Sequence, residues 1–436
     1  MKLYLKYIFA LLFSTTWLLV SVYLSYPWVL EISKYIGTFF AWSAVLGISL
    51  IPGIALSFVG ISLYLDKRPK FTLEKKELPP ISILIAAYNE ESCIYETLKS
   101  VYSQYYPSKF EVIVVSDGSK DKTVEYVNLF RKNYKSDNLI VIDNAENKGK
   151  ALVLNQGLDY CSHELIISLD ADSVLHEKAL EKIVSTMNCS DENYAAVAGT
   201  ILCRNYEKSF MARLQYWDYL IGISSIKRIQ SMYQGTLVAQ GAFSIYKKSI
   251  LKQVGGWPDK IGEDIVLTWN ILEKGYKVGH SEHAICFTNV PETYKSFYNQ
   301  RKRWSRGLIE AFFSYPKLLF MKRKSTFFIW YNFFFPFVDF IFLFVFFPGV
   351  LAALIFKFYL IAGIVTLLQV PLAIMYNITI YYIQKNSLKE EKISIPPGMW
   401  AASLIYILIY QLIMTPATLD GYLSEFLRKK KTWGHD

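Results

Sequence analysis

Cysteine and histidine are scarce in this sequence of 436 residues, which contains five of each. The cysteines are scattered and form no C-x-x-C pair, so nothing indicates a disulfide framework or a cysteine-based zinc site. The histidines are equally dispersed and H-E-x-x-H is absent, which argues against a histidine-based metal centre. This composition fits a reducing, cytosolic environment for the polar part of the chain.

Two phosphate-binding signatures are also missing. The P-loop pattern G-x-x-x-x-G-K-[ST] does not occur, which disfavours a transporter with a nucleotide-binding regulatory domain. The pattern G-x-G-x-x-G is absent as well, so the chain is not an ordinary dinucleotide binder. The formal net charge is +10, but no basic helix face, RNP-like strand or zinc finger accompanies it, and we expect no nucleic-acid partner.

Hydrophobic residues make up 53% of the chain and gather in two blocks, at about 8–65 and 327–419. Runs of about 20 apolar residues are long enough to cross a bilayer. The blocks predict two amino-terminal spans, at about 8–28 and 37–64, and three carboxyl-terminal spans, at about 327–356, 358–383 and 399–417. The sequence thus predicts an integral membrane protein with a polar middle.

Basic residues set the expected orientation. Lys67, Arg68 and Lys70 follow the second span and favour the cytosolic side for everything after it. We therefore expect a multi-pass protein of the inner (plasma) membrane with a cytosolic middle. Three further crossings would leave the basic residues 428–431 outside, against the same rule. Either one carboxyl-terminal segment is re-entrant or interfacial, or the rule fails here.

The polar middle, about 79–320, alternates strand and helix signals. ISILIAAYN, FEVIVVSDGS, LIVIDN and ELIISLDAD indicate strands separated by amphipathic segments of helical length. This alternation is typical of a mostly parallel α/β sheet. Ligands of such sheets bind beyond the carboxyl ends of the strands, where Asn89, Glu90, Asp117 and 170–172 cluster.

The strongest single pattern at a strand end is Asp170-Ala171-Asp172. Side chains two apart on a strand share a face, so the two carboxylates could hold a hard divalent cation and its bound phosphates. A solvated loop is the simpler interpretation of D-x-D alone. The role of Asp117 in VVSDGS has two equally supported interpretations, because this residue could contact a nucleotide or belong to a helix-capping turn.

Two helix starts carry further candidates. Gly149-Lys150 opens a helix, and a helix amino terminus with a lysine suits a phosphate. Glu263 and Asp264 open another, where acids are common because they interact favourably with the helix dipole. The glycine-rich loop before them could instead present one acid as a general base.

The stretch NQRKRWSRG, residues 299–307, precedes the second hydrophobic block. On a helix over 296–313, Gln300, Arg303 and Trp304 lie on one face, which suits a sugar diphosphate in transfer. Arg301, Lys302 and Arg306 lie elsewhere around the helix, where we expect contact with lipid head groups. Asp339 and Gln369 are polar residues inside expected spans and should face protein or a cavity.

The ordered set AAYNE, VVSDGS, DAD, GED and QRKRW resembles the processive, inverting family 2 glycosyltransferases, which include cellulose, chitin and hyaluronan synthases. QGAFSIYKKS, VGGWPDKIGEDIVLTW, FTNVPETY and QRKRWSRGLIEAF look most like the bacterial poly-N-acetylglucosamine synthases of biofilms, and this likeness covers about 80–313.

The resemblance implies a GT-A domain, with a mixed, mostly parallel sheet, inserted between transmembrane helices. The implied organisation is two amino-terminal transmembrane helices (1–65), a cytosolic GT-A domain (66–295), amphipathic interface helices with Q-x-x-R-W (296–325), carboxyl-terminal transmembrane helices (326–420) and a basic tail (421–436).

On the donor side the resemblance implies a UDP-sugar, with the uridine held by Ala87, Tyr88, Glu90 and Asp117. Lys150 would lie near the diphosphate. Asp170 and Asp172 would bind the donor and Mg2+ or Mn2+, with Asp172 the direct metal ligand.

On the acceptor side the resemblance implies Asp264 as the base for the acceptor hydroxyl. Gln300, Arg303 and Trp304 would close the site, with Arg303 near the leaving diphosphate and Trp304 under the acceptor sugar.

The expected reaction is processive, inverting polymerisation of N-acetylglucosamine from UDP-N-acetylglucosamine into a β-linked, β-1,6 polysaccharide. The polymer would leave through the adjacent membrane helices, and a small membrane accessory subunit is an expected partner. Alternatives are a synthase of chitin, hyaluronan or cellulose, and a non-processive transferase acting on a lipid carrier, although the latter relatives often share D-x-D but not Q-x-x-R-W.

Overall fold

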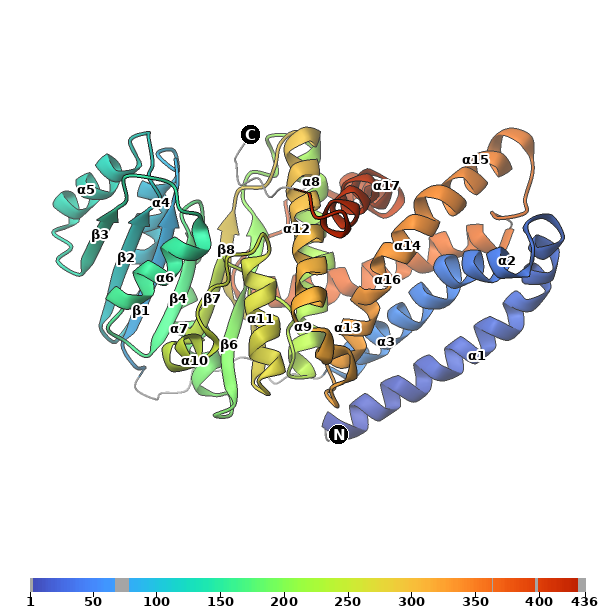
Figure 1. The fold of residues 1–436 in the computed structure, drawn as a ribbon, viewed down its shortest axis with the longest axis horizontal. Helices are drawn as coiled ribbons and strands as arrows, with labels where there is room; N and C mark the ends of the chain where they lie inside the picture. The colour runs from blue at the N-terminus through green and yellow to red at the C-terminus, as the bar shows by residue number, and fades with distance from the viewer. Residues whose placement is uncertain (1–2, 67–77, 363, 397–398, 430–436) are drawn as a thin grey trace.

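The computed structural model describes residues 3–66, 78–362, 364–396 and 399–429. The basic cluster expected at 67–76 and the side chain of Gln369 lie outside the described residues, as do Lys430 and Lys431. Figure 1 shows an α/β domain at one end of the molecule and a bundle of long helices at the other.

One mixed sheet forms the centre of the domain, in the order β3-β2-β1-β4-β7-β6-β8-β5. β3, β2, β1 and β4 are parallel, β7 runs antiparallel to β4 and β6, β6 and β8 are parallel, and β5 pairs antiparallel with β8. The strands are β1 Ile81–Ala87, β2 Phe110–Ser116, β3 Leu139–Asp143, β4 Leu165–Asp170, β5 Val174–Leu175, β6 Tyr194–Cys203, β7 Phe243–Lys247 and β8 Lys277–Thr288. This confirms the mixed, mostly parallel sheet expected from the sequence.

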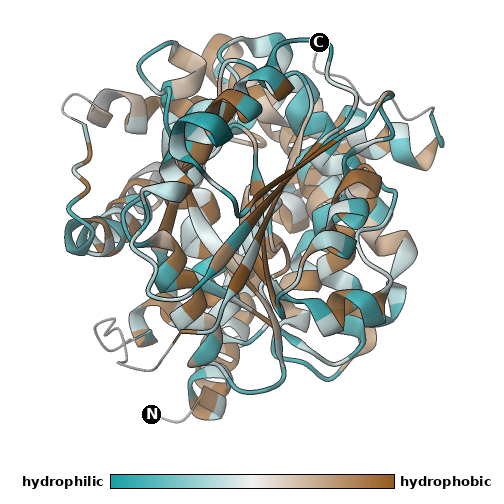
Figure 2. Cartoon of the chain, turned by 90° about the vertical axis from the view of Figure 1, so that its left-hand side faces the viewer, coloured by the Kyte–Doolittle hydropathy of each residue, from teal (hydrophilic) through white to brown (hydrophobic). Residues whose placement is uncertain are grey.

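Burial on both faces explains why the inner strands are almost wholly apolar. β1 reads ISILIAA and lies between β2 and β4, and Figure 2 shows hydrophobic strands surrounded by helices of mixed polarity. The helices of the domain are α4 Ile94–Tyr102, α5 Thr123–Tyr134, α6 Lys150–Tyr160, α7 Ala179–Asn188, α8 Phe210–Trp217, η2 Asp218–Ile223, α9 Ser224–Met232, α10 Lys248–Val254 and α11 Glu263–Glu273.

Strand register brings the candidate residues to one edge of the sheet. Ala87 pairs with Ser116, and Ala86 pairs with Asp170, so β1, β2 and β4 end at the same level. The polar residues that follow these strands therefore meet at their carboxyl ends, as the alternation of strands and helices predicts.

Long helical passes form the bundle in Figure 1. One pass is α1 Leu3–Ile36, and the next is made of α2 Thr38–Val45, η1 Leu46–Leu50 and α3 Ile51–Leu65. A further pass is made of α13 Thr326–Phe333, α14 Phe335–Ile341, η4 Phe342–Phe346 and α15 Phe347–Phe356. It is followed by α16 Ile364–Glu390. The turns after α1 and after α15 meet at the end remote from the sheet, where Trp28 Nε1 donates to the carbonyl of Leu360 at 2.8 Å.

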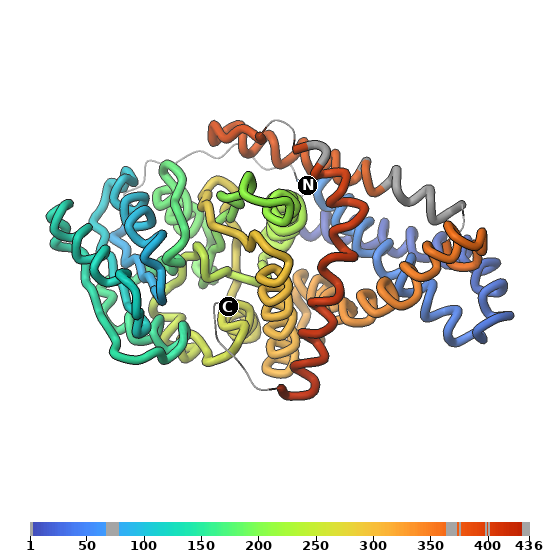
Figure 3. Tube along the Cα trace, turned by 90° about the horizontal axis from the view of Figure 1, so that it is seen from above, coloured from blue at the N-terminus to red at the C-terminus, as the bar shows by residue number. Residues whose placement is uncertain are grey.

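The last helices join the domain to the bundle. α12 Tyr294–Ser314 is followed by η3 Pro316–Phe320, and α17 Met399–Phe426 packs along α12. Seen from above, α17 runs across the direction of the bundle, at its boundary with the domain (Figure 3). By length and composition alone, the described residues contain four candidate membrane spans, Leu3–Ile36, Thr38–Leu65, Thr326–Phe356 and Ala402–Phe426.

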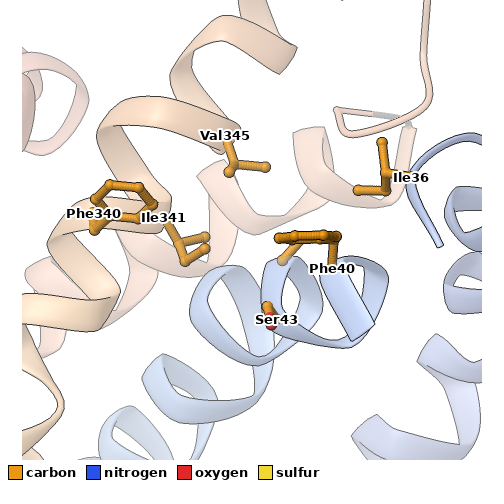
Figure 4. Close-up of a pocket in the computed structure, with 7 residues that line it drawn as sticks. Ile36, Phe40, Ser43, Phe340, Ile341 and Val345 are labelled. Atoms are coloured by element: carbon orange, nitrogen blue, oxygen red, sulfur yellow. The ribbon is translucent and has the colours of Figure 1, made fainter. Parts of the chain in front are cut away.

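An apolar cavity of about 450 Å³ opens in the bundle, remote from the strand ends (Figure 4). Its lining residues are Ile36, Phe40, Ser43, Ala44, Phe340, Ile341 and Val345. With one hydroxyl among seven side chains, it offers no charged group for a sugar nucleotide.

Candidate active site

Asp117 fixes the loop that leads into α6. Its buried carboxylate accepts hydrogen bonds from the backbone N–H groups of Lys148, at 2.6 Å, and Gly149, at 3.0 Å. Gly118 allows this close approach, because a Cβ there would lie 2.5 Å from the carbonyl carbon of Glu146. Asp117 thereby sets the position of Lys150, a role that neither sequence interpretation included.

The loop after β1 brings Glu90 to the D-x-D pair. Burial, followed by the carboxylates of Asp172 and Asp170, raises the pKa of Glu90 to about 8. Asn89 has a left-handed backbone, with φ of 54°, and its side chain accepts from the N–H of Lys120 at 2.9 Å. This loop is thus held against the loop after β2. Ala87 is buried at the end of β1, and Tyr88 beside it is half-buried.

Lys150 connects two acidic motifs that are far apart in the sequence. Its Nζ lies 2.6 Å from Asp170 Oδ1 and 3.5 Å from Glu263 Oε1. Burial by itself would lower the pKa of Lys150, but the carboxylates of Asp170 and Glu263 raise it above its usual range. Lys150 is therefore a firmly charged group between the D-x-D and G-E-D motifs.

Asp172 is held less tightly than Asp170. Thr288 and Ser173 hydroxyls donate to its two oxygens, each at 3.3 Å. Burial, followed by the neighbouring Asp170 carboxylate, raises the pKa of Asp172 to about 6. Two adjacent carboxylates that disfavour each other's charge are suited to share a divalent cation.

The carboxylates fit Mg2+ or Mn2+ only as a partial ligand set. Within residues 3–66, 78–362, 364–396 and 399–429, no group of three or more acidic, histidine or cysteine side chains is assembled as a metal site. Ions of this kind commonly take one or two protein carboxylates and complete their coordination with substrate phosphates and water. Asp170 and Asp172 meet that requirement.

Glu263 and Asp264 open α11 but differ in environment. Glu263 is buried beside Lys150, and burial raises the pKa of its carboxyl group. Asp264 is half-buried, and its Oδ1 accepts from the N–H of Ile265 at 2.7 Å. Of the two acids, Asp264 therefore has the less enclosed carboxylate.

A contact between two glycines brings this motif to α12. A Cβ on Gly262 would lie 2.6 Å from the Cα of Gly307, so a side chain at this position requires displacement of the backbone. The N–H of Gly262 also donates to Glu310 Oε2 at 3.1 Å. The G-E-D loop and the Q-x-x-R-W helix thus form one wall.

The predicted face of α12 is directed toward this site. The charge of Arg303 acts on Glu263, and Gln300 Oε1 is buried without a hydrogen-bond partner among the described residues. Trp304 is 39% exposed, and its ring lies 6.4 Å from that of Tyr219. Burial raises the pKa of the Tyr219 hydroxyl, and the ring contact places η2 beside Trp304. Sequence reasoning missed Tyr219, because nothing in its local pattern distinguishes it from a core aromatic.

The expectation that Arg301, Lys302 and Arg306 contact lipid head groups is wrong. Arg301 and Arg306 are buried, and all three cations pair within the protein. Their partners are Asp218 at 2.9 Å, Asp420 at 2.7 Å and Glu425 at 3.1 Å, respectively. The error has a physical reason, since α17 and η2 supply acids that the local sequence around α12 does not reveal.

The fold and the site together define the class of protein. In structural comparison the chain is similar to a mannosyltransferase from Pyrobaculum calidifontis solved with GDP-Man and Mn2+, with a TM-score of 0.58 and 19% identity, over 89% of this chain and 99% of that one. At that identity the likeness establishes the fold, which is GT-A.

Sequence comparison then narrows the likeness. Residues 82–255 match the family model described as glycosyl transferase family 2. The chain is 34% identical over 268 residues to the poly-beta-1,6-N-acetyl-D-glucosamine synthase of Staphylococcus aureus (strain COL), covering 59% of this chain and 64% of that one. It is 36% identical over 235 residues to the synthase of the same name from Staphylococcus epidermidis, covering 54% and 56%. The match thus spans less than two thirds of these relatives.

Proposed function

We propose that this protein is a processive, inverting glycosyltransferase that polymerises N-acetylglucosamine from UDP-N-acetylglucosamine into a β-1,6-linked polysaccharide and exports it through its own membrane helices. The observation that carries the proposal is the Lys150 bridge between Asp170 and Glu263, because it joins a donor motif to an acceptor motif. The staphylococcal relatives, named for this polymer, support the choice of sugar and linkage.

The donor side would hold the sugar nucleotide at the strand ends. Ala87, Tyr88, Glu90 and Asp117 would surround the uridine, and Lys150 and Arg303 would supply positive charge toward the diphosphate. Mg2+ or Mn2+, bound by Asp172 and Asp170, would supply further charge to stabilise the departing UDP. The Mn2+ of the mannosyltransferase of similar fold is consistent with this requirement.

The acceptor side would deprotonate the attacking hydroxyl. The acceptor oxygen attacks the anomeric carbon from the face opposite UDP, so an α-linked donor gives a β-linked product. Asp264 would accept the proton as the new bond forms and the bond to UDP breaks. Gln300 would accept a hydrogen bond from the acceptor through its unpartnered Oε1, while the exposed part of Trp304 would support a sugar ring.

Adjacent membrane helices give the product a route. α12 and α17 lie between the domain and the helical bundle, so a polymer leaving Trp304 would meet the bundle first (Figure 3). We propose that the chain is a multi-pass protein of the plasma membrane with its domain in the cytosol. A small membrane accessory subunit would join it there.

The decisive experiment uses purified protein in nanodiscs with radiolabelled UDP-N-acetylglucosamine and Mn2+. We expect a high-molecular-weight product that an enzyme specific for β-1,6 linkages degrades. Chitinase, hyaluronidase and cellulase, with the matching UDP-sugars, test the other polymers. Release of UDP without polymer, or a single sugar on a lipid carrier, would refute processive synthesis.

A further inference from the structure

Arg301 lies inside the Q-x-x-R-W motif but faces away from the site. Its side chain is buried, with 4% exposed, and the guanidinium carbon lies 4.2 Å from the ring centroid of Trp304. The same carbon lies 5.1 Å from the ring of Phe297, one turn earlier. The guanidinium therefore fills the space between two aromatic rings, and the Trp304 indole packs against it.

An acid from another element pairs with this guanidinium, and two tyrosines donate hydrogen bonds to that acid. Asp218 Oδ2 lies 2.9 Å from Arg301 Nη2 and accepts from the Tyr410 hydroxyl at 2.9 Å. Tyr406 donates to Asp218 Oδ1 at 3.4 Å. We call Asp218, Arg301, Tyr406 and Tyr410 the Asp218 network. It joins η2, α12 and α17 beneath Trp304.

The backbone around Asp218 is shaped for this contact. Asp218 begins the π-helical turn η2, and such turns reorient side chains by accommodating one extra residue, often at functional sites. A Cβ on Gly222 would lie 2.9 Å from Asp218 Oδ1 and 3.2 Å from the Tyr406 hydroxyl oxygen. Glycine at 222 therefore leaves room for the carboxylate and the hydroxyl to meet.

We propose that Arg301 is a positioning residue for the acceptor: it fixes the Trp304 ring on the side away from the exposed face and, through Asp218, makes the ring position depend on α17. The inference rests on the proposed function, because it assigns a geometry to the acceptor sugar that Trp304 supports. A planar guanidinium is required, since an ammonium group retains the charge but cannot cover an indole in the same way.

The matched pair Arg301→Lys and Arg306→Lys tests this directly. Both residues are buried on α12 and pair with acids, but Arg306 pairs with Glu425 on α17, whereas Arg301 pairs with Asp218 and packs against the Trp304 ring. Kinetics are measured in nanodiscs with UDP-N-acetylglucosamine and added oligosaccharide acceptor. We expect Arg301→Lys to raise the acceptor KM roughly tenfold, as loss of a cation–π contact can do, with the donor KM unchanged and shorter polymers.

A double-mutant cycle with Trp304→Ala separates positioning from general stability. If Arg301 acts through the indole, Arg301→Lys should have no further effect on the acceptor KM in the Trp304→Ala background. Additive effects, an unchanged acceptor KM, or an equal rise in the Arg306→Lys control would overturn the proposal.

A second variant covers the case in which Arg301→Lys does not fold. Tyr410→Phe keeps the aromatic ring and the charges of Arg301 and Asp218, but it removes the hydroxyl that donates to Asp218. This variant should also raise the acceptor KM. An unchanged acceptor KM in a folded Tyr410→Phe protein would then show that the Asp218 network does not position the acceptor. Wild-type protein that makes no polymer refutes the proposed function instead, so the two failures are distinguishable.

Discussion

At the scale of single residues, Glu263 and Asp264 are adjacent acids with different environments. Glu263 is buried and its carboxylate lies 3.5 Å from Lys150, whereas the carboxylate of the half-buried Asp264 accepts from the backbone N–H of Ile265. A base must have a free lone pair within reach of the hydroxyl that it deprotonates. Asp264 therefore suits the proposed base better than Glu263 does.

Replacing Asp264 by Asn should abolish sugar transfer while UDP binding stays nearly intact, because the amide keeps the shape but cannot accept the proton. Radiolabel incorporation measures transfer, and calorimetry measures UDP binding. Asp259→Asn, an exposed acid in the preceding loop, is the matched control and should retain activity. Loss of UDP binding in Asp264→Asn would mean that this residue serves the donor.

The Gly262–Gly307 contact predicts that activity is sensitive to substitution of Gly262, although this residue carries no charge. Gly262→Ala should lower kcat/KM by roughly 100-fold, since displacement of a catalytic loop by about 1 Å has that effect. Gly60→Ala in α3 is the control, because its Cβ would have its nearest neighbour at 3.8 Å, on Tyr376. Activity of Gly262→Ala equal to that of the control would show that the G-E-D loop and α12 need not touch.

At the scale of elements, a buried ionic cluster anchors the end of α16 to the domain. Glu391 pairs with Lys182 of α7 and accepts from His283 Nδ1 of β8 at 2.9 Å. Burial by itself would raise the pKa of Glu391, but the hydrogen bonds from His283 and Lys182 hold it below the ordinary value. A depressed carboxyl pKa stabilises the folded state above the ordinary pKa of 4.5, and this stabilisation is lost as the pH falls through the folded pKa.

Glu391→Gln should therefore destabilise the protein at neutral pH by about 3 kcal/mol, because Lys182 would stay buried without its anion. Thermal unfolding in detergent, followed at several pH values, measures the change and should show a smaller difference from wild type in acid. Glu390→Gln is the neighbouring control, since that carboxylate is more exposed and lies 3.9 Å from His283. Equal unfolding temperatures for the two variants would contradict the anchoring role.

Local sequence explains some of these features and not others. Asp170, Lys150 and Asp264 could be identified as candidates because each stands at the end of a strand or the start of a helix, where a parallel sheet gathers its polar groups. The Asp218–Arg301 pair could not be found in this way. Its partners belong to separate elements, and a π-helical turn does not follow the periodicity of 3.6 residues by which faces are assigned.

At the scale of the whole molecule, the contacts of α17 bear on a conflict in the charge pattern of the sequence. Three crossings after the domain would place the basic carboxyl end outside, but α17 contacts the domain along its length. Met399 accepts from Trp217 near its start at 3.0 Å, and Glu425 pairs with Arg306 near its end. Its polar partner in the bundle is Asp339, which accepts from Gln411 and Thr418 at 2.9 and 2.8 Å. These contacts favour an interfacial helix over a crossing one.

An interfacial α17 predicts four crossings, with both chain ends on the side of the domain. Green fluorescent protein fused to the carboxyl terminus should fluoresce, and alkaline phosphatase fused there should be inactive, because the first matures only in the cytosol and the second only outside it. Phosphatase inserted after Lys357, in the turn between α15 and α16, should be active, since that turn lies at the far end of the bundle (Figure 1). An active phosphatase at the carboxyl terminus would instead make α17 a fifth crossing.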